Sequence, residues 1–343
     1  MTPRLLPLMI AATFWLAACG HPPPGVEVAG ERLPVVDMHL HAGRWEDMPP
    51  WFQARLTERV PRGFKWTVEV LSDWTLTGEG ILAELDRAGV SGGGIFALYS
   101  PHTTGLARNE FVAEAVSVDP RRLFGFASIR VDKWNVDGAQ ELARLESDLV
   151  NLEHMVGIKL AHAHQQIRFD DERFYGIYEI AGRFGKPVYL HTATSPNPGT
   201  RLEPPYTDPA YLEEAIRRYP QTVFILGHAG WDSAARKLTY VNTCIDLAGR
   251  YDNVYMEPGA LGARRAAEVL PDFLQRIKAA KLAHKLIYGS DGPQFPTYVK
   301  THLDAFVDGM QAAGFTVAEM RMILADNFTR VFGLPAFELA RDE

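Results

Sequence analysis

The sequence predicts an α/β protein, a (β/α)8 TIM barrel with a long insertion after the first strand. Eight short apolar segments alternate with longer segments of helical pattern along the 343 residues. Most of the short segments are apolar throughout, which is typical of parallel strands that are covered on both faces. One strand and one helix recur at intervals of roughly 30–35 residues, and eight such units build one barrel domain.

The strands are expected where a short apolar segment is bounded by polar or glycine-rich residues. The eight expected strands are Val35–His39, Gly93–Leu98, Leu123–Ile129, Val156–Ala161, Pro187–His191, Val223–Gly227, Asn253–Glu257 and Leu286–Gly289. A doubly wound open sheet is the alternative architecture. It is disfavoured because the chain has no G-x-G-x-x-G motif or P-loop after an early strand.

The helices are expected between these strands and after the last of them. Their expected ranges are Gly80–Ala88, Gln140–Leu152, Asp171–Phe184, Ala210–Tyr219, Ala234–Gly249, Ala263–Ala280, Val299–Gly314 and Val317–Phe332. The connection between the first two strands is roughly 50 residues long, far beyond an ordinary βα loop. Most of this insertion is rich in aromatic residues and proline, namely Trp45, Pro49, Pro50, Trp51, Phe52, Trp66 and Trp74. It either packs as a subdomain that shields the barrel rim or forms a lid over the active site.

The N-terminus has the pattern of a secretory signal. Arg4 supplies the positive end and Leu5–Leu16 the apolar stretch, and the small residues Ala17 and Ala18 precede Cys19. The stretch before this cysteine resembles the bacterial lipoprotein signal, in which the cysteine is lipidated. An ordinary signal peptide that happens to contain a cysteine is the alternative.

This pattern divides the chain into three expected parts. Residues 1–18 are the lipoprotein signal peptide, 19–33 are the lipidated Cys19 with a proline-rich tether, and 34–343 are the barrel. The protein is then expected in the bacterial cell envelope, facing the periplasm and touching the membrane through its lipid only. The formal net charge of -7 argues against a nucleic-acid partner, which would normally require a basic face, so a small molecule is the expected partner.

Polar residues that suit a metal stand at the ends of several expected strands. His39 and His41 are two apart in the first strand and point the same way, while His191, His228 and Asp291 end three others. Barrel enzymes carry their catalytic groups at this end of the strands. Imidazoles gathered without a metal would each need a hydrogen-bond partner, so we expect one divalent cation, zinc first, with manganese, iron or cobalt as alternatives.

These motifs resemble the amidohydrolase superfamily, in particular the amidohydrolase-2 (aminocarboxymuconate-semialdehyde decarboxylase-like) family. The segments that carry the resemblance are Val36–His41, Gly157–Leu160, Val188–Thr192, Leu226–Gly230, Asn253–Glu257, Ile287–Pro293 and Asn327–Leu334. The resemblance implies that His39, His41, His191 and Asp291 bind one metal. It also implies that His228 polarises the substrate or moves a proton, and it allows a homodimer.

The chain departs from this family after its fourth strand. In many relatives the Gly-Ile-Lys-Leu stretch runs directly into His-Pro, whereas here Ala161 and His162 follow Leu160. Lys159 either binds a substrate carboxylate, is carboxylated and bridges a second metal, or pairs with an interior acid such as Glu257. His162 and His164 are expected in a loop or at the rim.

The expected reaction is hydrolysis of an amide, ester or lactone by water that the metal activates. Asp291 would take the proton from the water, and His228 would hold the developing oxyanion. A non-oxidative decarboxylase or other lyase acting on an unsaturated or aromatic carboxylate is the alternative. That reaction needs a cation for the carboxylate, for which Lys159 and Arg44 are the candidates. Glu257 is expected with them among the substrate-binding residues. A tethered barrel that binds but does not catalyse is the third hypothesis.

Overall fold

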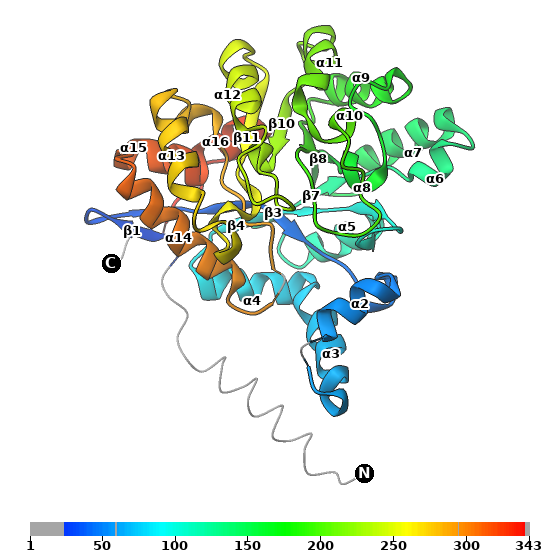
Figure 1. Cartoon of the computed structure of the whole chain (residues 1–343), viewed down its shortest axis with the longest axis horizontal. Helices are drawn as coiled ribbons and strands as arrows, with labels where there is room; N and C mark the ends of the chain where they lie inside the picture. Colours follow the sequence, from blue (N-terminus) through cyan, green and yellow to red (C-terminus); the bar gives the residue numbers. More distant parts are fainter. Residues whose placement is uncertain (1–23, 59, 294, 340–343) are drawn as a thin grey trace.

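The computed structural model describes residues 24–58, 60–293 and 295–339. Seven parallel strands form one curled sheet in the order β3-β4-β7-β8-β9-β10-β11 (Figure 1). The strands are β3 Val36–His41, β4 Gly92–Phe96, β7 Leu123–Ala127, β8 Met155–Leu160, β9 Val188–His191, β10 Phe224–Gly227 and β11 Val254–Glu257. All seven coincide with strands expected from the sequence, to within two residues at either end. The α/β barrel class is therefore confirmed.

The eighth expected strand, Leu286–Gly289, is not a regular strand. Its segment is joined to β11 by a parallel bridge between Met256 and Leu286 and to β3 by another between Leu40 and Gly292. The backbone N–H of Met38 also donates to the carbonyl of Tyr288, at 3.1 Å. The segment thus closes the ring between the edge strands through isolated bridges without a continuous ladder, and its backbone has a φ of +67° at Asp291.

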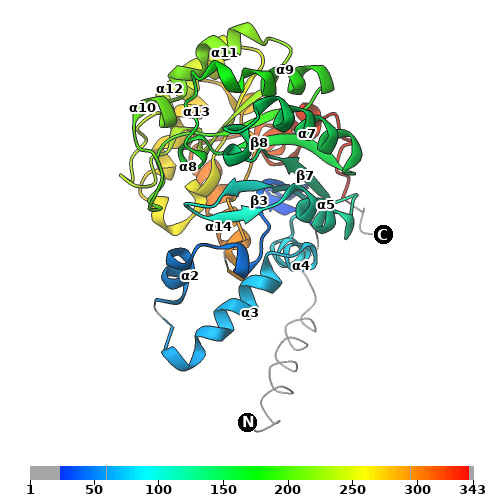
Figure 2. The same ribbon diagram turned by 90° about the vertical axis from the view of Figure 1, so that its right-hand side faces the viewer.

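Helices cover the outside of the curled sheet (Figures 1 and 2). The longer ones are α4 Gly78–Ala88, α5 Asn109–Ser117, α7 Gly138–Asn151, α9 Tyr175–Phe184, α12 Val241–Arg250, α13 Leu270–Ala279 and α14 Tyr298–Ala312. Helix α12 starts seven residues later than expected, because Asp232 and Lys237 pair across a turn before it. Helix α5 was not expected from the sequence.

The core has two parts, one between the sheet and the helices and one inside the barrel. The inner part is built from side chains that point inward from the strands, including Met38, Phe96, Phe126 and Tyr189. The barrel interior is therefore a packed core and not a pore, and its reactive groups are confined to the end where the strands finish.

The beginning of the described chain differs from the expected tether. Strands β1 Val26–Val28 and β2 Glu31–Leu33 pair as an antiparallel hairpin, with Val28 and Leu33 buried. The signal peptide over 1–18 and the lipidation site at Cys19 lie outside the described residues. Among the residues that the structure describes, no helix has the length and hydropathy needed to cross a bilayer.

The insertion after β3 has two helices with different surroundings. Helix α2, Pro50–Thr57, lies beside the barrel, and the Arg55 guanidinium donates to the Asn197 side chain at 3.1 Å. Helix α3, Lys65–Thr75, extends away from the barrel in both views (Figures 1 and 2). The insertion is thus attached to the barrel at one end and projects into solvent at the other.

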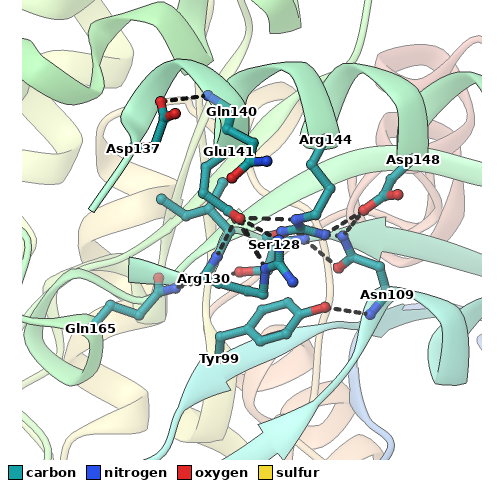
Figure 3. Close-up of polar contacts among 11 residues, drawn as sticks. Tyr99, Asn109, Ser128, Arg130, Asp137, Gln140, Glu141, Arg144, Asp148 and Gln165 are labelled. Carbon is teal, nitrogen blue, oxygen red and sulfur yellow. Dashed lines mark hydrogen bonds and ion pairs between the residues drawn. The ribbon is translucent and has the colours of Figure 1, made fainter. Parts of the chain in front are cut away.

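A buried polar network holds the loop that follows β7 (Figure 3). The Arg144 guanidinium donates to Glu141, to Asp148 and to the Ser128 carbonyl, at 2.5–3.1 Å. The Asn109 amide closes the network, because it donates to Ser128 and Asp148 and accepts from the Ser128 N–H. These bonds fasten helices α5 and α7 to one rim of the barrel.

Candidate metal centre

Three potential ligands converge at the end of the barrel where the strands finish. The Asp291 Oδ1 lies 3.1 Å from His39 Nε2 and 2.9 Å from His41 Nε2. One ligand atom from each of the three residues lies within 4.8 Å of the other two. Ligands about 2.0–2.1 Å from a tetrahedral zinc are about 3.3 Å apart, so these separations fit a single small cation.

The strand geometry explains why these side chains meet. His39 and His41 alternate with Leu40 in β3, so both imidazoles point to the same side. The backbone N–H groups of Asp291 and Gly292 donate to the His39 carbonyl at 3.0 and 3.2 Å. Behind them, the buried Asp37 carboxylate accepts from the backbone N–H groups of His39 and Ser290. Asp291 is thereby fastened to the same strand as the two histidines.

A second layer of residues determines which nitrogen of His39 faces the site. The Tyr189 hydroxyl donates to Glu257 Oε2 at 2.9 Å and lies 3.0 Å from His39 Nδ1. Because the hydroxyl proton is directed to Glu257, its oxygen accepts from His39 Nδ1–H. This assigns the proton to Nδ1 and leaves Nε2 as a lone-pair ligand, which is the usual arrangement behind a metal-binding imidazole.

Glu257 belongs to this supporting layer. It is fully buried and accepts from the Tyr189 hydroxyl and from the backbone N–H groups of His228 and Gly259. Burial opposes its ionisation, but the neighbouring His39 and His228, including the His228 backbone N–H, prevail and lower the pKa of Glu257 to about 2. Its oxygens are directed to protein groups, whereas the sequence led us to expect it at the substrate.

His191 and His228 flank the group of three. Their ring centroids are 4.4 Å apart, and the His228 ring lies 5.2 Å from that of His39. The His191 Nε2 is buried and has no hydrogen-bond partner among the described residues. Burial lowers the pKa of His228 to about 4, which leaves this imidazole neutral near pH 7.

The backbone around His228 is shaped to present this ring. His228, Ala229 and Gly230 all have positive φ, a conformation that costs energy for residues other than glycine. Gly259 packs so closely on the imidazole that a Cβ there would approach His228 Nδ1 to 2.1 Å. A tight turn and a glycine therefore hold the imidazole in one position.

Two further residues were expected at the substrate: Lys159 is buried in the barrel beside the site, and Arg44 lies on its outer rim. Lys159 is only 1% exposed, and its Nζ lies 3.7 Å from the centre of the Tyr189 ring and 4.5 Å from that of Phe96. Burial lowers the pKa of Lys159 to about 7. Arg44 stands on the outer rim, with its side chain 49% exposed, above Phe111 and 3.8 Å from Glu114.

Tyr189 was given no role from the sequence, and the two histidines after β8 were expected in a loop or at the rim. Tyr189 precedes His191 by two residues in β9, so strand alternation alone could have directed it to the site. His162 and His164 lie in the short helix α8, His162–Gln165, and both are buried. The His164 ring lies 5.0 Å from that of His191, and its Nδ1 lies 3.0 Å from the Thr103 hydroxyl.

Solved structures of similar fold come from several bacteria. An uncharacterised TIM-barrel protein from Bordetella bronchiseptica is 20% identical, covering 88% of this chain and 99% of that one, with a TM-score of 0.65. A probable 2-pyrone-4,6-dicarboxylic acid hydrolase from Acinetobacter baumannii is 18% identical over 88% and 100%, with a TM-score of 0.58. The 5-carboxyvanillate decarboxylase from Sphingomonas paucimobilis is 14% identical over 89% and 100%, with a TM-score of 0.56. At these identities the likeness establishes the fold alone.

Comparison of the sequence with known proteins identifies the family of this chain. Protein FluG of Emericella nidulans is 26% identical over 149 residues, which are 41% of this chain and 16% of that protein. The chain therefore spans only a small part of this curated relative. The model of the Amidohydrolase family matches residues 36–334, which include both histidines of β3 and Asp291. With this match and the barrel that carries the three converging ligands, the chain belongs to the Amidohydrolase family.

Proposed function

We propose that this protein is a metal-dependent hydrolase that acts on an amide, ester or lactone. The supporting observation is the convergence of His39, His41 and Asp291 beside a neutral, buried His228. His191, with its buried and unpartnered Nε2, is the fourth ligand. The nitrogen and carboxylate donors suit zinc first, with manganese, iron or cobalt as alternatives.

The chain's own residues divide the work of hydrolysis. A divalent cation, when bound, supplies Lewis acidity and lowers the pKa of a water molecule. Asp291 accepts the proton from the attacking water and passes it to the leaving group. His228 donates a hydrogen bond to the oxyanion that develops on the substrate carbonyl. Because this imidazole is neutral, it donates through its ring N–H and carries no positive charge of its own. Tyr189 and Glu257 keep His39 in the tautomer that the site requires.

The positions of Lys159 and Arg44 favour hydrolysis over decarboxylation. A decarboxylase needs a cation that grips the substrate carboxylate. Lys159 is buried under two aromatic rings, and Arg44 is drawn to Glu114 on the outer rim. A neutral carbonyl compound needs neither residue.

A substrate screen on the metal-loaded protein tests this proposal. Neutral lactones, esters and amides should gain water, with one equivalent of metal per chain found by elemental analysis. Release of CO2 from aromatic carboxylates, without hydrolysis of any neutral compound, would establish the lyase alternative. A protein without stoichiometric metal, whose melting temperature ignores a chelator, would favour a binding protein over an enzyme.

We also propose that the protein is held on the periplasmic side of the bacterial envelope by lipid on Cys19. Support comes from the signal-like residues 1–18 that precede this cysteine. Cys19→Ser should release the protein from the membrane fraction. Cells that express this variant should contain the chain with its signal peptide still attached. Unchanged processing with a soluble product would establish an ordinary signal peptide instead.

A further inference from the structure

The most exposed apolar surface on a helix of the described chain lies on and beside α3. Phe64, Trp66, Val70, Leu71 and Trp74 are 61%, 50%, 55%, 43% and 44% exposed, and together they are called here the α3 apolar face. Trp66, Val70 and Trp74 are four residues apart and therefore form one stripe along the helix. Contiguous exposure of large apolar side chains on this scale marks an interaction site.

The candidate active site does not account for this face. Helix α2 is the part of the insertion that touches the barrel, through Arg55 and Asn197. The loop before it is also tied down, because Arg108 forms a bidentate pair with Asp47 at 2.8 Å. Helix α3 stands clear of the barrel in both views (Figures 1 and 2). Within this helix only Thr75 is buried.

Helix α3 is amphipathic, with an apolar and a polar side, as helices that lie in a membrane interface are. Lys65, Glu69 and Asp73 are also four residues apart and form a polar stripe beside the apolar one. Tryptophan at the boundary of such faces is typical of the headgroup region, where an amphipathic ring has both an apolar and a wet neighbour. The helix has 11 residues, too few to span a bilayer, so it can only lie at its surface.

The size and shape of the face favour a bilayer over a second copy of the chain. Half-exposed side chains of this size present roughly 100 Å² each, so the face offers roughly 500 Å². A stable dimer covers roughly 800 Å² on each partner. A narrow stripe on a projecting helix falls short of that area, whereas it can enter a lipid headgroup layer to a depth of about 5–10 Å.

The expected lipid anchor and α3 can reach the same plane. From Cys19 to Gly25 the chain spans at most about 20 Å. The Gly25 N–H donates to the carbonyl of Gly89 at the C-terminal end of α4. Helix α3 leads into the other end of α4, which is 11 residues and therefore about 16 Å long. The tether of about 20 Å and the length of α4, about 16 Å, are thus short enough for the lipid on Cys19 and the near end of α3 to touch one flat membrane surface.

We propose that the α3 apolar face inserts into the headgroup region of the phospholipid bilayer and forms a second membrane contact beside the lipid on Cys19. One acyl anchor leaves a domain free to rotate on its tether, whereas a second contact fixes its orientation. Since Asp47 and Arg55 tie the insertion to the rim, this contact also fixes the mouth of the barrel relative to the bilayer. Like the proposed lipid anchor, this contact requires that the protein meets a bilayer. It does not depend on which reaction the protein catalyses.

Site-specific fluorescence on the full chain tests the proposal. Val70→Cys, labelled with an environment-sensitive maleimide dye, is mixed with vesicles of phosphatidylethanolamine and phosphatidylglycerol that contain brominated lipid. Val150→Cys is the matched control, because Val150 is a 62% exposed valine on α7, away from the insertion. The parent chain, treated in the same way, reports any labelling of Cys19 or the buried Cys244. We expect bromine to quench the dye at position 70 and not at position 150.

Removal of the aromatic anchors provides the second measurement. Trp66→Ser combined with Trp74→Ser should lower the quenching at position 70 about tenfold, and the chain should stay folded because about half of each side chain is already in solvent. Raising the salt from 0.1 to 0.5 M should change the signal little, since screening weakens charge attraction and not apolar insertion.

Three outcomes would overturn the proposal. Quenching at neither position would show that the face does not enter lipid, and equal quenching at both would show adsorption without orientation. A dimer in sedimentation velocity that the double tryptophan substitution dissociates, together with no quenching at position 70, would assign the face to a second copy. Loss of the Cys19 anchor alone is recognised separately, because Cys19→Ser would weaken vesicle binding and leave the difference between positions 70 and 150.

Discussion

Two buried polar clusters lie at the same end of the barrel, and they differ in whether their polar atoms have partners. In the network around Arg144, the described side chains of Asn109, Glu141 and Asp148 all bond to one another or to the backbone (Figure 3). In the candidate metal centre, the His191 Nε2 is buried without a hydrogen-bond partner among the described residues. The first cluster is complete as protein, and the second is complete only with a ligand.

The energetic difference explains the contrast. A buried polar atom without a partner costs about 1–3 kcal/mol, so a folded chain keeps such atoms only where something else satisfies them. In the network around Arg144 every such atom has a partner, so the bonds stabilise the folded rim. In the candidate metal centre the unpartnered atom destabilises the free protein, and a bound cation would remove that penalty.

The largest expected effect comes from removing a ligand of the metal centre. His39→Ala should abolish metal binding and lower kcat/KM at least about 10³-fold, because one of three converging donors is lost. Elemental analysis and turnover on the same preparation measure both. His154→Ala, an exposed histidine beside Glu153, is the control and should change neither. Full metal content in the His39 variant would contradict the ligand assignment.

Asp291→Asn separates binding from proton transfer. The amide keeps the shape of the side chain and one oxygen donor but cannot accept a proton as the carboxylate does. We expect kcat to fall by about 10²–10⁴-fold while part of the metal is retained. Turnover close to that of the parent chain would exclude Asp291 from proton transfer. Asp304→Asn, which removes an exposed carboxylate, serves as the control.

Tyr189→Phe tests the supporting layer. Loss of the hydroxyl removes the acceptor of His39 Nδ1–H, so metal affinity should fall about 10–100-fold with the fold intact. Competition with a chromophoric chelator measures the affinity. Tyr288→Phe is a matched control, since it removes a buried tyrosine hydroxyl 3.0 Å from another histidine, His302, outside the ligand group. Equal losses in both variants would indicate general packing and not positioning.

Glu141→Gln tests the other cluster. It should lower the free energy of unfolding by about 2 kcal/mol, because Arg130 and Arg144 lose a charged partner. The metal content and kcat should not change. Chemical denaturation measures the loss, and Glu146→Gln on the same helix, whose carboxylate pairs with Arg183 in solvent, should cost about 0.5 kcal/mol or less. A loss of activity without a loss of stability would break the distinction between the two clusters.

The smallest expected effect is the pH dependence of that stability difference. Burial opposes the charge on Glu141, but its bond to Arg130 and the charge of Arg144 prevail and lower the pKa of Glu141. A carboxylate with a lowered pKa stabilises the fold above the unfolded pKa of about 4.3, and this contribution is lost as the pH falls through the folded pKa. The difference between the parent and Glu141→Gln should therefore be constant near pH 7 and shrink in acid. A difference that grows on acidification would reverse the sign assigned here.

Much of the fold follows from local patterns. Seven of the eight predicted strands are present, because strands buried on both faces leave continuous apolar segments such as those of β9 and β10. Segments whose conformation depends on contacts with distant parts of the chain were not predicted correctly. Leu286–Gly289 is apolar like a strand, but its segment is joined to the two edges of the sheet only by isolated bridges.

The candidate site was predicted in part for the same reason. His39 and His41 follow from strand alternation, and Asp291 from its place after an apolar segment. Arg44 was expected to bind a substrate carboxylate, and its position beside Glu114 depends on α5, which was not predicted. The roles of Tyr189 and Glu257 depend on the distance between two strands that are adjacent only through β10.

Residue types and their spacing were thus sufficient to predict the barrel, the candidate metal ligands and the end of the barrel where they gather, because alternation along a strand is a local property. Folding in three dimensions decided which nitrogen of His39 faces the candidate metal site, why Lys159 is enclosed by rings, and that α3 carries its tryptophans into solvent. These depend on contacts between segments far apart in the chain, which no local pattern encodes.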